Sequence, residues 1–166
     1  MYRIGIGKAY ANLSSGTPLT LGGVHIPSEY GLIGNRDGDI ISLALTDAIL
    51  GSANFGGIDE MFPENTPEFR NLKSFELLTA AFVRIANEGY RIGNIDIIVN
   101  TNIDFSALLS EIQSKLGIIL EINRINIKIQ QTETPAQTAT AIALVDQNLL
   151  TKRNREVLAR NNPTGF

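Results

Sequence analysis

One segment of the chain alternates between apolar and polar side chains over most of its length: residues 124–132, RINIKIQQT. In a β-strand this pattern places Ile125, Ile127 and Ile129 on one face and Lys128 on the other. Such a strand has one apolar face, so the chain must supply a layer that covers it. Three segments can do so, because their apolar residues recur at helical spacing: 37–50, 72–86 and 105–117.

The other segments complete an order of strand, hairpin, helix, loop, helix, strand, helix, strand, strand. Strands are expected at 2–7, 92–101 and 137–145, and a tight hairpin at 19–27 around Gly22 and Gly23. Gly51 and Gly117 are expected to end the first and third helices. This order predicts an α+β fold, an α/β sandwich with helices packed on a sheet. Residues 1–145 are expected to form a single domain, and the polar residues 146–166 a C-terminal extension.

The composition argues against several classes of function. A formal net charge of -3 disfavours a nucleic-acid-binding protein, which would need a basic surplus. With no Cys and a single His, His25, the chain cannot build a thiolate site or a two-histidine metal site. No apolar run approaches the roughly 18 residues of a transmembrane helix, and the N-terminus does not resemble a signal peptide. We therefore expect a cytoplasmic protein without a membrane partner.

The segment 35–51, NRDGDIISLALTDAILG, raises a question about its centre. On a helix, Asp39, Leu43 and Asp47 lie along one face at intervals of four residues. Two carboxylates in this arrangement can support a metal ligand between them, but Leu43 is not one. Capping is the competing interpretation for Asp37 and Asp39, since carboxylates at a helix start accept hydrogen bonds from free N–H groups.

Longer motifs occur in order along most of the chain: RIGIG at 3–7, LTLGGVHIP at 19–27, GLIGNRDGDIISLALTDAILG at 31–51, FPENTPEF at 62–69, GYRIGNIDIIV at 89–99 and INIKIQQTE at 125–133. Together they resemble the 2-C-methyl-D-erythritol 2,4-cyclodiphosphate synthase family of the non-mevalonate pathway of isoprenoid biosynthesis. The resemblance implies one mixed sheet of four to five strands backed by helices, and a homotrimer with ligand pockets between subunits. It also implies a lyase reaction in which a phosphate attacks a diphosphate within one molecule and CMP leaves.

The same resemblance implies a zinc ion held by an Asp and a His on the first strand and a His on the helix. Those positions are Ala9, Ala11 and Leu43 here, and none of them has a donor atom. We therefore expect a divergent member that lacks the family zinc, with no cofactor, no metal ligand and no catalytic residue. Tyr10 is expected to help fill the former metal cavity. A divalent ion at Glu133, which binds the second metal in the family, is left open.

Five residues are candidates for binding a ligand in the former phosphate pocket: Arg36, Asp37, Asp39, Thr132 and Glu133. A basic residue such as Arg36 could bind an anion directly, with its charge in place of a metal. The competing interpretation for Arg36 is a surface ion pair with Asp37 or Glu60. Glu133 could equally be a solvent-facing residue at a strand end.

Two hypotheses of function follow from these departures. The leading one is a pseudoenzyme that keeps the trimeric scaffold for a binding, structural or regulatory role. The alternative is an enzyme of altered chemistry that acts on a phosphorylated or nucleotide ligand without the family zinc. Under both, the expected partners are the other subunits of a homotrimer and a nucleotide or phosphorylated small molecule between subunits, with no nucleic acid.

Overall fold

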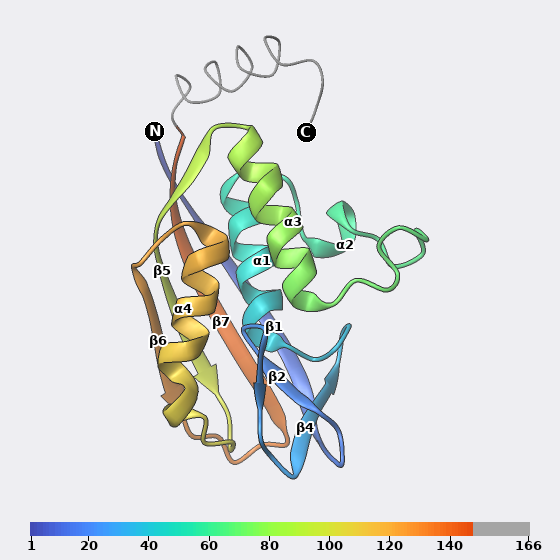
Figure 1. Ribbon diagram of the computed structural model, residues 1–166. Helices are drawn as coiled ribbons and strands as arrows, with labels where there is room; N and C mark the ends of the chain where they lie inside the picture. Colours follow the sequence, from blue (N-terminus) through green and yellow to red (C-terminus); the bar gives the residue numbers. More distant parts are fainter. Residues whose placement is uncertain (148–166) are drawn as a thin grey trace.

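The computed structural model describes residues 1–147, which form a succession of strands and helices shown in Figure 1. The strands are β1 (Tyr2–Ser15), β2 (Leu19–Leu21), β3 (Val24–Ile26), β4 (Tyr30–Gly34), β5 (Tyr90–Asn100), β6 (Ile125–Gln130) and β7 (Ala136–Gln147). The helices are α1 (Ile40–Ser52), α2 (Ile58–Met61), α3 (Ser74–Asn87), the 3-10 helix η1 (Ser106–Leu108) and α4 (Leu109–Leu120).

Five of the strands form one sheet in the order β4-β1-β7-β5-β6, and β2 and β3 form a separate hairpin. β5 and β6 run parallel while the other neighbours run antiparallel, so the sheet is mixed. The helices α1, α3 and α4 lie on one face of it (Figure 1). Along β6, Ile127 is buried while Asn126 and Lys128 are exposed, as the alternating pattern requires. This is the expected α+β architecture.

The first strand and the first helix approach each other unusually closely. A Cβ atom at Gly5 would lie 1.8 Å from the Ala48 carbonyl oxygen, and one at Gly7 would lie 2.1 Å from the Ala44 carbonyl oxygen. No side chain fits at either position, so the RIGIG motif lets the α1 backbone rest directly on β1. α3 covers the other side of α1, and nearly the whole helix is therefore buried.

Within residues 1–147, no helix lies on the opposite face of the sheet (Figure 1). Along β1 this face presents large apolar side chains that are exposed in the single chain, and Ile142 continues the patch on β7 beside its pairing partner Ile6. Monomeric soluble proteins rarely expose contiguous apolar surface of this kind. The β1 members of this outer-face patch are Tyr2, Ile4, Ile6 and Tyr10.

The extent of several elements differs from what the sequence predicts. β1 runs to Ser15 rather than residue 7, because its buried face consists of Gly5, Gly7, Ala9 and Ala11, which give little apolar signal. Similarly, β7 continues two residues beyond 145 to Gln147. The predicted loops also contain two short elements, β4 and α2.

Both glycines expected to end helices lie inside them. Gly51 belongs to α1, whose C-cap is Ala53, and Gly117 belongs to α4, which continues to Leu120. The left-handed conformation that ends α4 falls on Glu121, with φ 55°. Residues 148–166 of the expected C-terminal extension lie outside the described part of the chain. Within residues 1–147, no helix is long and apolar enough to cross a membrane.

Candidate functional site

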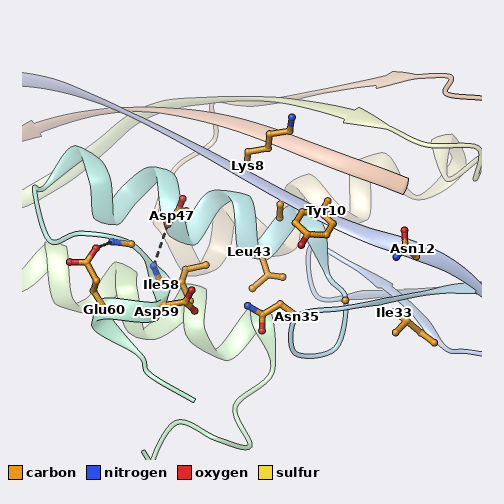
Figure 2. A pocket seen from close by; sticks show the side chains of 13 residues that line it. Lys8, Tyr10, Asn12, Ile33, Asn35, Leu43, Asp47, Ile58, Asp59 and Glu60 are labelled. Atoms are coloured by element: carbon orange, nitrogen blue, oxygen red, sulfur yellow. Dashed lines mark hydrogen bonds between the residues drawn. The ribbon is translucent and has the colours of Figure 1, made fainter. Parts of the chain in front are cut away.

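A cavity of about 610 Å³ lies where β1, β4, α1 and α2 meet (Figure 2). It opens because β4 pairs with β1 only between Ala11 and Ser15, and its chain leaves the sheet after Gly34. The edge of β1 beside Ala9 is therefore not covered by β4. The lining consists of Lys8, Ala9, Tyr10, Asn12, Ile33, Gly34, Asn35, Leu43, Asp47, Gly57, Ile58, Asp59 and Glu60.

The floor of the cavity is apolar. Leu43 projects into it from the first turn of α1 and is only 4% exposed, and the methyl group of Ala9 contributes from β1. Ala11 is buried beside Gly34, where an added Cβ would lie 2.9 Å from the Ala11 Cβ. Tyr10 does not fill the cavity as expected, because its ring is on the outer face of β1 and the residue is 70% exposed.

Three carboxylates stand around this floor, from Asp47 on α1 and from Asp59 and Glu60 on α2. The Ile58 backbone N–H donates to Asp47 Oδ1 at 3.3 Å, and the Gly57 N–H donates to Glu60 Oε1 at 3.1 Å. Burial raises the pKa of Asp47, the charges of Asp59 and Glu60 raise it further, and the bond from Ile58 opposes them. The cavity therefore carries a concentration of negative charge.

Lys8, the one cation among the described residues of the lining, does not neutralise these carboxylates. Lys8 extends from β1 away from α1 (Figure 2), and it forms no ion pair within the described part of the chain. Asp59 is exposed and likewise has no hydrogen-bond or ion-pair partner among residues 1–147.

Asp39 lies outside the cavity and caps α1. Its carboxylate accepts four hydrogen bonds: from Gly22 N at 2.8 Å, Gly23 N at 2.8 Å, Ser42 N at 3.0 Å and Ser42 Oγ at 2.7 Å. Complete burial raises the pKa of Asp39, and these hydrogen bonds oppose the rise. The capping interpretation of Asp39 is confirmed, and the same carboxylate also fastens the β2–β3 hairpin to the helix.

Arg36 and Asp37 hold a segment of the chain that is distant in sequence. The Arg36 side chain is 3% exposed, and its guanidinium donates to the carbonyl oxygens of Phe62, at 2.9 Å, and Phe69. Its Nε atom lies 3.2 Å from Glu64 Oε1. Arg36 therefore pairs with Glu64, and the competing interpretation, a surface ion pair with Asp37 or Glu60, is wrong. Asp37 accepts hydrogen bonds from the N–H and hydroxyl of Ser74, the first residue of α3.

Thr132 and Glu133 are not brought to the cavity within one chain. They follow β6, which forms the opposite edge of the sheet from β4. Glu133 is exposed, and the Thr132 hydroxyl lies 3.1 Å from that of Thr134. Of the five candidate residues, none lines the cavity that contains Ala9 and Leu43.

The side chains at positions 9, 11 and 43 cannot coordinate a zinc ion. Ala9, Ala11 and Leu43 have hydrocarbon side chains and no donor atom. Among the residues described, no three His, Cys, Asp or Glu side chains are grouped closely enough to hold a metal ion. The sequence signal for the carboxylates that do line the cavity is the pair Asp59 and Glu60 after Gly57, a helix start with acidic residues in its first turn.

The model of the YgbB family matches residues 2–145. The chain belongs to the YgbB family. Two relatives named 2-C-methyl-D-erythritol 2,4-cyclodiphosphate synthase support this. The Bacillus licheniformis protein is 34% identical over 150 residues, covering 89% of this chain and 95% of the relative. The Enterococcus faecalis protein is 39% identical over 137 residues, covering 81% of this chain and 87% of the relative.

Solved structures show that this YgbB-family chain also shares its fold with such proteins. A 2C-methyl-D-erythritol-2,4-cyclodiphosphate synthase in a CDP-bound form superimposes with a TM-score of 0.83 at 27% identity, covering 87% of this chain and 100% of the other. The CDP complex of Plasmodium falciparum IspF gives a TM-score of 0.75 at 28% identity, covering 89% of this chain and 97% of the other. The family and the α+β fold expected from the sequence are confirmed.

Proposed function

We propose that this YgbB-family protein has lost the zinc-dependent, CMP-releasing cyclisation and serves a binding, structural or regulatory role on the same scaffold. The observation that carries the proposal is the hydrocarbon floor formed by Ala9 and Leu43. Family resemblance assigns two of the three zinc ligands to these positions, and the third to Ala11. Alkyl groups cannot coordinate a metal, so the Lewis acid of the family reaction has no ligands here.

The charge of the cavity supports the same proposal. Phosphate and diphosphate groups are polyanions, and catalysis on them requires cations placed where charge develops. The cavity instead presents Asp47, Asp59 and Glu60, with Lys8 turned away. Without bound metal ions, this lining repels the groups that the family reaction joins.

The alternative, an enzyme of altered chemistry on a phosphorylated or nucleotide ligand, has less support. The CDP-bound structural relatives favour a nucleotide ligand by likeness alone. In this chain, however, the guanidinium of Arg36 is engaged by the carbonyls of Phe62 and Phe69 and by Glu64. It is therefore not free to replace a metal at an anion site.

We also propose a homotrimer with ligand pockets between its subunits. The outer-face patch supports it, because an apolar surface of this kind is stabilised by contact with another chain. Pockets between subunits would also let residues that are far apart in one chain, such as Asp47 on α1 and Glu133 after β6, meet across an interface. Light scattering should report three times the 18.0 kDa chain mass, and a monomer would contradict the assembly.

A zinc-binding and turnover experiment tests the loss of activity. The wild-type protein and Leu43→His should both lack zinc by native mass spectrometry, because Leu43→His restores only one of three ligands. The triple variant Ala9→Asp, Ala11→His, Leu43→His supplies the full set and should bind one zinc per chain. Turnover of the family substrate by the wild-type protein with zinc, well above a no-protein blank, would overturn the proposal.

A further inference from the structure

The cavity at Ala9 and Leu43 combines an apolar floor with an acidic rim, and this combination selects a class of ligand. We propose that it binds a small organic cation with an apolar body, such as a primary ammonium carrying an aromatic or alkyl group. The inference rests on the proposed function, because a zinc ion held at residues 9, 11 and 43 would occupy the same space. It goes beyond that function by naming a ligand chemistry opposite in charge to a phosphate.

The size and floor of the cavity fit the apolar part of such a ligand. About 610 Å³ lies within the usual range of small-molecule pockets. Leu43 and Ala9 form a hydrocarbon surface there, and Ile58 adds to it from α2. Tyr10 borders the cavity from β1, with its exposed ring on the outer face of the strand.

The rim fits the charged part. Asp47 accepts a single hydrogen bond, through Oδ1 from Ile58 N, and its other oxygen has no partner among residues 1–147. Asp59 is exposed and free of described partners. Burial and the like charges of Asp59 and Glu60 raise the pKa of Asp47, and this carboxylate forms no ion pair with any cation among residues 1–147. An ammonium group placed between Asp47 and Asp59 would supply a compensating positive charge.

A divalent metal ion fits the same rim less well. Metal ions need several carboxylates converging on one point, and the described residues contain no such group. Glu60 is tied to the Gly57 N–H, and Asp47 to the Ile58 N–H. These bonds hold both side chains against the start of α2, where they can flank a bulky cation without enclosing a metal.

Calorimetric titration with benzylamine, and with benzyl alcohol, benzoate, CDP and Mg²⁺ as comparison probes, tests the inference on the full-length protein. Benzylamine should bind with a dissociation constant of about a millimolar, as expected for a ligand of its size. Benzyl alcohol has nearly the same shape without the charge, and it should bind at least fivefold more weakly. Benzoate and CDP should show no binding, and the amide signals of Gly57 and Ile58 should shift with benzylamine in NMR spectra.

Substitutions test whether the carboxylates of Asp47 and Asp59 are responsible for benzylamine binding. Asp47→Asn and Asp59→Asn should each weaken benzylamine binding at least threefold, while Glu111→Gln, an exposed carboxylate on α4, should leave it unchanged. Equal binding of benzylamine and benzyl alcohol, tighter binding of CDP, or equal effects of Asp47→Asn and Glu111→Gln would each overturn the inference. Its failure is distinguishable from that of the proposed function: zinc-dependent turnover contradicts the latter, whereas absence of both turnover and amine binding contradicts this inference alone.

Discussion

Two carboxylates on α1 show how one helix serves both the fold and the cavity. Asp39 stands at the helix start, is fully buried, and accepts four hydrogen bonds from the β2–β3 hairpin and from Ser42. Asp47 lies two turns further along, is half-buried, and accepts one. The residue type is the same, so the number of donors that face each carboxylate decides its role. A satisfied carboxylate stabilises the fold, and an unsatisfied one can receive a ligand.

The packing of α1 against β1 also separates residues that stabilise the fold from residues that line the cavity. At one end, the backbones touch through Gly5 and Gly7. At the other end, Ala9 and Leu43 face a cavity instead of each other's backbone. Substitutions along this pair of elements should therefore separate residues that hold the fold from residues that only line the cavity.

Gly7→Val should have the largest effect. An added Cβ would lie 2.1 Å from the Ala44 carbonyl oxygen and 2.6 Å from the Ala48 nitrogen, so β1 would have to leave α1. We expect no cooperative unfolding transition in urea monitored by circular dichroism. The control is Gly51→Ala, in open space within α1, which should stabilise the protein by up to about 1 kcal/mol. Normal unfolding of Gly7→Val would show that the contact is not required.

Leu45→Ala and Leu43→Ala form a matched pair on α1. Leu45 is enclosed in the core, and its truncation should lower the free energy of unfolding by about 3 to 4 kcal/mol. Leu43 borders the cavity and has fewer neighbours to lose, so its truncation should lower it by about 1 to 2 kcal/mol. Urea denaturation measures both values. Equal decreases in the free energy of unfolding would mean that Leu43 is packed as fully as the core residue Leu45.

Asp39→Ala should lower the free energy of unfolding by about 2 to 3 kcal/mol, because it removes the helix cap and leaves the Gly22 and Gly23 N–H groups without their acceptor. Asp47→Ala removes one hydrogen bond at a half-exposed site and should lower it by less than about 1 kcal/mol. Thermal unfolding followed by calorimetry compares them. A larger effect of Asp47→Ala would reverse the assignment of the two carboxylates.

Asp47→Asn should give the smallest effect, visible as a dependence on pH. The pKa of Asp47 is raised in the folded protein, so its contribution to stability is fully present below the unfolded value of 3.8 and is lost as pH rises through the folded value. The melting temperature of Asp47→Asn relative to wild type should therefore increase from pH 3.5 upward and then level off. A relative melting temperature that falls over this range would contradict the direction of the shift.

Local patterns in the sequence predicted most of the fold. The three long helices follow from apolar spacing, and the hairpin follows from Gly22 and Gly23. The full length of β1 could not be predicted, because its buried residues are small and were selected by contact with a helix distant in sequence. Short elements such as β4 and α2 leave equally little local pattern.

The candidate site was predicted less well, since its contacts join distant parts of the chain. Asp39 as the cap of α1 follows from the local sequence. The local sequence does not predict that Arg36 donates to carbonyl oxygens in the loop 62–69. It also does not predict the hydrogen bond from Ser74 to Asp37. Ala9 and Leu43 could be named from the family motif, but the acidic rim contributed by α2 required the structure.

The neighbouring residues Arg36 and Asp37 fasten both ends of one surface loop. Arg36 holds the chain at Phe62, Glu64 and Phe69, and Asp37 holds it again at Ser74. With the anchors fixed, residues 65–68 form a short excursion whose length is not dictated by the sheet or the cavity. Each doubling of a flexible loop costs only about 0.6 kcal/mol. This stretch is therefore a place where the chain can accept inserted residues, or an inserted domain, while the cavity keeps its shape.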